Sequence, residues 1–239
     1  MGKAIGGGNV VLYYGVNNLT TYFNQASISR DNDLKDVTDF ADTSREYAKG
    51  LNSGGATLTG LYDDTAANID AILNTAFAAA AGTVLTIGPV RDTIGRAAYL
   101  LLSQKSKYEI PARVEEIVAL AADIQADGGV DRGIWLHAAG AETGTVNSAS
   151  VDNSASSSNG GVAHLHVSAI TATSVTVKIQ HSANDSTWAD LATFAAFAPS
   201  TGSERLVVAA GTTVDRYVRC IISTFVGTTV TYAVAFARR

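Results

Sequence analysis

The stretch DVTDFADTSREYAKGLNSGGATLTGLYD, residues 36–63, joins a densely charged segment to a segment with the composition of a β-strand. The charged part mixes acidic and basic side chains around two aromatic residues, Phe40 and Tyr47. The last part, ATLTGLYDD, and the earlier stretch TYFNQASIS both favour strands. We therefore predict two strands connected by a long charged loop over residues 36–55.

The C-terminal part of the chain also has the period-two pattern of β-strands. In SVTVKIQHS, residues 174–182, apolar and polar side chains alternate, and VDRYVRCIIS and TVTYAVAFA repeat the pattern. With AHLHVSAI, WADLATFAAF and ERLVVAA, the pattern predicts about six short strands, a number typical of a sandwich or jelly roll. Cys220, the one cysteine, lies on an apolar strand face and is predicted to be buried.

One helix is predicted, and one further segment is ambiguous. Apolar residues from Ile69 to Ala80 recur at helical spacing, which indicates a helix over about 65–81, begun by Asp64 or Thr65 and ended at Gly82. The stretch VEEIVALAADIQADGG fits a helix or a strand. We favour a strand, because ADGGVDRGIWL reads as a turn leading into a second strand.

Charge and composition divide the chain in two. Residues 1–140 hold 16 acidic and 11 basic residues, whereas residues 141–239 hold six of each. The intervening segment 141–161 is rich in Ser, Gly and Asn, as flexible linkers are. We therefore predict a mainly β fold: a β-barrel or sandwich domain with one flanking helix over 1–140, a linker over 141–161, and a second β-sandwich, jelly-roll or Ig-like, over 162–239.

No arrangement of residues indicates an enzyme or a cofactor. The chain has no GxSxG nucleophile motif, and Gly6–Gly8 lack the flanking residues of a phosphate-binding loop. His164, His166 and His181 supply no certain set of metal ligands, so no metal site is predicted. The acidic sequence pI of 5.3 argues against nucleic-acid binding.

The N-terminal residues lack the pattern of a signal peptide, and no apolar run approaches the ~20 residues of a membrane span. We therefore expect a soluble protein. Trp188, in QHSANDSTWADL, is a candidate for stacking on a carbohydrate. A carbohydrate- or surface-binding role through the C-terminal sandwich is thus the alternative function, although capping of the core is the commoner role for such a tryptophan.

Residues 36–63 resemble the major tail tube proteins of long-tailed bacteriophages. The resemblance rests on the pattern DVT-x-F-x-D-x-x-R-E-Y-x-x-G-L followed by TLTGLYD. The C-terminal stretches QHSANDSTWADLATF, DRYVRC and AVAFARR resemble the region appended to some of these proteins. The resemblance covers about half of the chain and is weakest over residues 64–110.

The resemblance implies a structural virion protein of the phage tail, assembled in the host bacterial cytoplasm, that forms stacked rings, usually of six subunits. Its expected partners are further copies of itself, the tape measure protein, the tail terminator and the distal tail components. The genomic DNA would pass through the tube without specific binding, and the second domain would lie on the tube exterior.

These expectations assign roles to particular residues. The charged loop would dock on the next subunit or ring through Phe40, Asp42, Arg45, Glu46, Tyr47 and Lys49. A carboxylate-lined channel would repel DNA phosphates, and the candidate acidic residues of the lumen are Asp31, Asp33 and Asp123.

Overall fold

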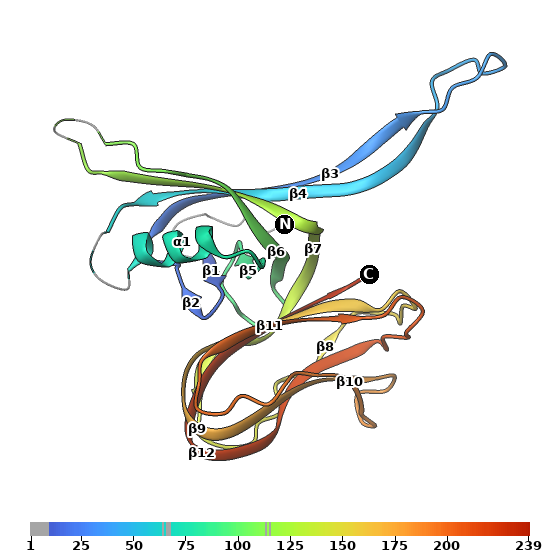
Figure 1. The fold of residues 1–239 in the computed structure, drawn as a ribbon. Coiled ribbons are helices and arrows are strands. Elements are labelled where there is room, and N and C mark those ends of the chain that lie inside the picture. The colour runs from blue at the N-terminus through green and yellow to red at the C-terminus, as the bar shows by residue number, and fades with distance from the viewer. Residues whose placement is uncertain (1–9, 64, 66–67, 113, 115) are drawn as a thin grey trace. The chain divides into compact units, whose positions relative to one another are not determined.

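The computed structural model describes residues 10–63, 65, 68–112, 114 and 116–239, and it confirms a mainly β fold with one helix among them. The sheet is not closed into a barrel. Its strands are hydrogen-bonded neighbours in the order β10 (Ala189–Thr193), β9 (Gly161–Ser182), β12 (Tyr217–Arg238), β7 (Ala119–Glu142), β6 (Ala97–Glu109), β5 (Thr83–Gly88), β1 (Val11–Tyr14) and β2 (Asn17–Asn18). The chain forms two compact units (Figure 1). Unit 1 comprises residues 1–20, 84–100 and 131–239, and unit 2 comprises residues 21–83 and 101–130.

Unit 2 is a sheet with a helix on one face. It contains β3 (Phe23–Asp36), β4 (Tyr47–Leu61), α1 (Ile69–Ala78) and parts of β6 (Ala97–Glu109) and β7 (Ala119–Glu142). β4 pairs antiparallel with both β3 and β7. Alternate residues of β4 and β7 are buried, and α1 lies along one face of the sheet (Figure 1). The buried set on these elements includes Ala56, Leu58, Leu120, Ala122, Ile124, Ile69 and Leu73.

Unit 1 is built around two very long antiparallel strands, β9 (Gly161–Ser182) and β12 (Tyr217–Arg238). β10 (Ala189–Thr193) and β11 (Gly202–Val208) pair with opposite ends of β9. The beginning of β12 pairs with β8 (Val151–Asp152), and its end pairs with the second half of β7. The remaining strands are β1 (Val11–Tyr14), β2 (Asn17–Asn18) and β5 (Thr83–Gly88).

The end of β12 is buried on both faces. Its larger residues, among them Tyr232 and Phe236, pack into the main core of unit 1. Its alanines face a second cluster that contains Tyr13 and Trp135. The small side chains let these two rings approach the strand, and the rings meet edge-to-face with centroids 5.6 Å apart. Cys220 is fully buried, as predicted, and burial raises the pKa of its thiol to about 12.

The six predicted C-terminal strands are four in the structure, because two pairs of them are continuous. AHLHVSAI and SVTVKIQHS both belong to β9, and VDRYVRCIIS and TVTYAVAFA both belong to β12. At the predicted turns the ladder between β9 and β12 shifts register instead of ending, between Ile222 and Val230. Bulges absorb the extra residues and leave the strands paired.

The ambiguous stretch forms a strand from Ala119 onward, as predicted, but the turn after it was wrong. Gly128 and Gly129 have φ values of 80° and 84°, and β7 nevertheless continues to Glu142. Its first half pairs with β4 and its second half with β12. The two glycines therefore lie within a single strand whose two halves belong to different units.

The helix is shorter than predicted. It spans Ile69–Ala78, with Asn68 at the N-cap position; Asp64, one of the two predicted caps, lies outside the described residues. Asp63 stabilises the segment that leads into the helix, since its carboxylate accepts hydrogen bonds from the Thr65 N–H and from the Asn68 amide. Ala79 is already extended, so the chain leaves the helix before Gly82. No helix in the described part of the chain is long and apolar enough to cross a bilayer.

The division into units differs from the predicted boundary at 141–161. That segment lies within unit 1 and runs along β12, to which it is hydrogen-bonded at several points. The Ser148 N–H donates to the Cys220 carbonyl at 2.9 Å, and the Ile222 N–H donates to the Val146 carbonyl at 2.8 Å. Low apolar content suggested a linker, but these backbone bonds tie the segment to the sheet.

Two buried histidines of unit 1, His164 and His166, form a hydrogen-bonded network with Thr86. His166 Nδ1 donates to the Gly15 carbonyl at 2.7 Å, so its Nε2 accepts from the Thr86 hydroxyl at 2.8 Å. The same hydroxyl lies 2.9 Å from His164 Nδ1. His181 is not part of this network and lies 3.0 Å from an Asp215 carboxylate oxygen. Burial lowers the pKa of His166 to about 4 and holds that of His164 well below its usual range.

This network predicts acid-sensitive stability. The unfolded chain protonates His166 near pH 6.5, whereas the folded chain does so only near pH 4. The free energy of unfolding therefore has its full value above pH 6.5. It falls as the pH drops from 6.5 to 4, and His166 accounts for about 3 kcal/mol of this loss. Urea unfolding at several pH values should show a smaller pH dependence for His166→Gln than for the wild type. Equal pH dependence in the two proteins would contradict this assignment.

Candidate functional site

The β3–β4 hairpin of unit 2 extends well beyond its sheet. β4 pairs with β7 only from Gly55 to Leu61, whereas β3 and β4 remain paired with each other as far as Asp36 and Tyr47. Residues 30–36 and 47–54 therefore form a two-stranded ribbon that projects from the sheet (Figure 1). The loop at its end is residues 37–46, shorter than the predicted 36–55, because residues 47–55 are paired in β4.

Short polar side chains shape this loop from within. The Asp39 N–H donates to Asp42 Oδ2 at 2.7 Å, and the Ala41 N–H donates to Asp39 Oδ1 at 2.7 Å. The Glu46 N–H donates to the Thr38 hydroxyl at 2.9 Å. Such turns are typical of Asp and Thr. Asp42, predicted to pair with another subunit, thus already accepts a bond inside its own loop.

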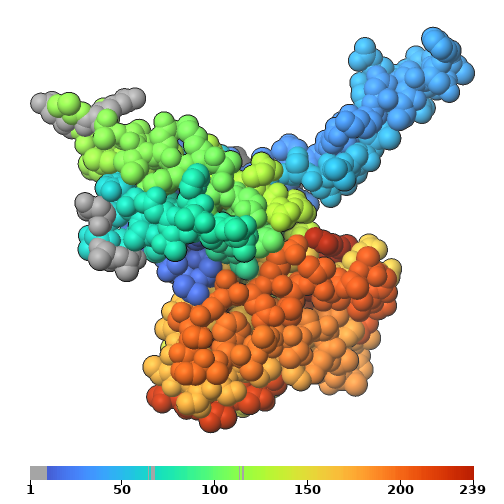
Figure 2. All heavy atoms as spheres, viewed as in Figure 1, coloured from blue at the N-terminus to red at the C-terminus, as the bar shows by residue number. Residues whose placement is uncertain are grey.

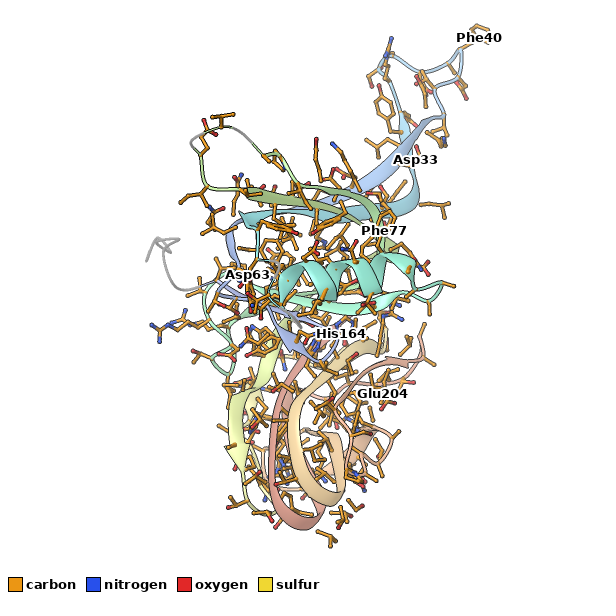
Figure 3. The ribbon with its side chains drawn as sticks, turned by 60° about the vertical axis from the view of Figure 1, so that its left-hand side comes forward. Asp33, Phe40, Asp63, Phe77, His164 and Glu204 are labelled. Atoms are coloured by element: carbon orange, nitrogen blue, oxygen red, sulfur yellow. The ribbon has the colours of Figure 1, made fainter. Side chains whose placement is uncertain are left out.

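Apolar side chains are exposed along the ribbon and its loop. The hairpin tip, defined as residues 34–51, carries five of them. Phe40 is fully exposed at the end of the loop and points away from the ribbon (Figure 3). The others are half-exposed or more, namely Leu34, Val37, Tyr47 and Leu51. A large apolar group in water marks an interaction site when several occur together.

The charged residues predicted at the tip have different surroundings. In the described part of the chain, Arg45, Glu46 and Lys49 form no ion pair, so their charged groups are available to a partner. Asp33 instead pairs with Lys35 at 2.9 Å, which offsets its charge. Phe40 and Tyr47 were predicted from the sequence, whereas Leu34, Val37 and Leu51 were missed. These three residues could have been recognised in the sequence as isolated apolar residues within a charged segment.

One face of the unit 2 sheet is polar and open. The polar face comprises residues directly opposite one another on β3, β4 and β7, in the rows Ser27–Thr57–Asp123 and Ser29–Gly55–Gln125. A shallow hollow of about 170 Å³ lies here, where Gly55 has no side chain. Asp31 continues the face two residues beyond Ser29. Asp31 and Asp123 thus share a face, while the charge of Asp33 is paired.

The acidity of the chain is concentrated in unit 2. Unit 2 contains 14 acidic and seven basic residues, a net charge of −7, whereas unit 1 contains eight acidic and ten basic residues, a net charge of +2. The difference in net charge between the two units is larger than the difference between residues 1–140 and 141–239, because residues 84–100 and 131–140 belong to the basic unit. The two predicted lumen residues of the polar face, Asp31 and Asp123, both belong to the acidic unit.

Trp188, the carbohydrate candidate, is already stacked on a protein group. The Arg219 guanidinium lies 4.0 Å from the ring centroid. Arg219 also donates to Gln180 Oε1 through Nε at 3.1 Å and Nη2 at 2.8 Å, and the Gln180 amide donates to Asp190 at 2.8 Å. These contacts hold the guanidinium over one face of the indole, so that face is not free for a sugar.

Several solved structures show a likeness to this chain, and two of them are described here. No protein-family model and no curated protein matches the chain. A protein from the virion of a native gene transfer agent particle is 14% identical, with a TM-score of 0.46 over 54% of this chain and 98% of its own. The SPP1 Dit protein, described as a hub of the adsorption apparatus in phages that infect Gram-positive bacteria, is 10% identical. Its TM-score is 0.39 over 95% of this chain and 98% of its own. The proposed function therefore depends on the surfaces of this chain.

The exposure of the tip predicts that it contributes little to folding. Phe40→Ala should change the free energy of unfolding by less than about 0.5 kcal/mol, because its ring contacts little in the isolated chain. Leu58→Ala, in the core of the same hairpin, should cost about 2–5 kcal/mol. Urea denaturation of the unassembled protein measures both. A large loss for Phe40→Ala would show that the ring packs within its own chain.

Proposed function

We propose that this chain is the tail tube subunit of a phage or phage-like particle, whose copies associate through the hairpin tip into stacked rings. The observation that carries the proposal is the full exposure of Phe40 at the end of a projecting ribbon. The resemblance of residues 36–63 to major tail tube proteins indicates the kind of assembly, a tube of stacked rings. By that likeness the rings contain six subunits, and the protein belongs to the virion tail.

The energetics of the tip suit an assembly of many copies. Burying the exposed fractions of its five apolar side chains is worth roughly 5–10 kcal/mol. Association costs about 4–15 kcal/mol of translational and rotational freedom. A single contact is thus weak, and a subunit becomes firmly held only when it makes several contacts in a ring and a stack. This dependence favours cooperative growth from an initiating complex over spontaneous pairing.

The edge of the unit 2 sheet can join subunits side by side. Among the described strands β3 pairs only with β4, so its outer edge offers backbone N–H and C=O groups to a neighbouring strand. Its charged residues, among them Arg30 and Asp31, discourage unspecific pairing of this edge. In the proposed ring, each subunit adds its strands to those of the next.

The acidic unit is proposed to line the channel. Unit 2 carries the whole excess of negative charge, and the residues that line the hollow of its polar face, Asp123 among them, present hydroxyl, amide and carboxylate groups and include no Lys or Arg. Such a surface repels phosphates and gives bases no ring to stack on. DNA would pass without specific binding. Unit 1 would lie on the exterior, and the tape measure, tail terminator and distal tail proteins would be the other partners.

The proposal predicts rings or tubes of the purified protein at high concentration. Phe40→Asp should abolish them, because a carboxylate replaces the apolar contact, while the circular dichroism spectrum stays unchanged. Val226→Asp is the matched control, since Val226 is an exposed apolar residue of unit 1. Negative-stain electron microscopy of the three proteins provides the measurement. Persistent monomers of the wild type, even with initiating tail components added, would refute the proposal.

The channel assignment makes a separate prediction about DNA. In assembled tubes, the double variant Asp31→Lys and Asp123→Lys should retain linear DNA at low salt, because four units of charge change in each subunit. Wild-type tubes should not retain it, and retention by the variant should disappear as the salt concentration rises. Replacing Asp185 and Asp190 of unit 1 by lysine is the control. Stronger retention by the control would place unit 1, and not unit 2, at the channel.

A further inference from the structure

A second apolar surface lies at the opposite end of the same unit 2 sheet. Leu61 at the end of β4 pairs with Ala119 at the start of β7, and the β6–β7 loop lies beside them. The β6–β7 end, defined as Leu61, Ile110, Val114 and Ile117, consists of exposed aliphatic side chains. Ile117 is 76% exposed and Val114 is 91% exposed.

Backbone bonds hold this end together. The Tyr62 N–H donates to the Val118 carbonyl at 3.0 Å, and the Ala119 N–H donates to the Pro111 carbonyl at 3.4 Å. These bonds fasten the end of β4 and both sides of the loop to one another. Leu61, Ile110 and Ile117 are therefore next to backbone groups that these bonds hold together, and Val114 belongs to the loop between the two strands.

The distribution of exposed apolar side chains is uneven. Twelve large hydrophobic residues are exposed in the described part of the chain, and ten of them belong to unit 2. Five lie at the hairpin tip and four at the β6–β7 end. The two groups project from opposite ends of unit 2 (Figure 2). Scattered apolar residues are normal on a protein surface, but two separate groups of this kind are typical of two interaction sites.

We infer that the β6–β7 end is the surface that receives the hairpin tip of another copy of this chain. The inference rests on the proposed function and identifies the surface on which the hairpin tip would dock. The tip carries two aromatic rings, and the β6–β7 end carries only aliphatic side chains, so rings from one copy can pack between the branched side chains of the next.

The positions of the two surfaces favour the hairpin tip of a second copy as the binding partner of the β6–β7 end. Seven residues of β3 lie beyond the part of the hairpin that pairs with β7, so the ribbon reaches about 20 Å past the sheet. Two different surfaces at opposite ends of one sheet join head to tail, which leaves a free tip and a free end after every addition. Tip-to-tip pairing would instead stop at a dimer.

Cysteine cross-linking tests the inference. Phe40→Cys and Ile117→Cys are made in two separately tagged proteins, and Cys220 stays in place because it is fully buried. Under assembly conditions with a mild oxidant, the mixture should yield a disulfide-linked heterodimer. We expect about tenfold more of it than in a mixture of Phe40→Cys with the control Val226→Cys, because a disulfide needs Cα atoms within about 7 Å. Leu51→Cys with Val114→Cys provides a second pair.

The outcomes separate this inference from the proposed function. Rings or tubes in the electron microscope, with neither tip–end pair cross-linking above the control, would overturn the inference and leave the tube proposal intact. Predominant Phe40→Cys homodimers would also overturn it, because they indicate tip-to-tip contact. Absence of any assembly from the unmodified protein, with its initiating components, would count against the tube proposal itself.

Discussion

The antiparallel pairing of β4 with β7 stops at Gly55, while β4 itself begins at Tyr47. Beyond that point β3 and β4 have only each other, and an isolated two-stranded ribbon is marginally stable in water. The tip therefore has no core of its own in which to bury Phe40 or Leu51. Its apolar groups stay exposed, and its loop depends on turns made by Asp36, Asp39 and Thr38.

This arrangement separates the requirements of folding from those of association. The core of unit 2 uses alternate residues of β4 and β7 with α1, and the core of unit 1 uses β9 and β12. Neither core uses the tip, so its residues can vary with the partner at little expense to the fold. The β6–β7 end is equally independent of the core, since Val114 and Ile117 are largely exposed.

The distribution of charge follows the units and not the order of the chain. β6 and β7 each give one part to unit 1 and another to unit 2, so a basic residue such as Arg132 and an acidic one such as Asp127 belong to different units. The same chain therefore contains one unit of charge −7 and one of charge +2. The charge count along the sequence revealed the imbalance but assigned it to residues 1–140. Of these, residues 1–20, 84–100 and 131–140 belong to the basic unit.

Period-two alternation was sufficient to predict a mainly β chain and the burial of Cys220. Helical spacing was sufficient for α1, and the mixed charges of residues 36–51 indicated a charged loop, although the loop itself spans only residues 37–46. These properties are local, because side-chain direction follows from neighbours in the chain. Strand length, the two halves of β7 and the attachment of residues 141–161 depend on partners far away in sequence. Only the tertiary structure decided them, since a glycine or a polar run ends a strand or bends it according to which backbone lies beside it.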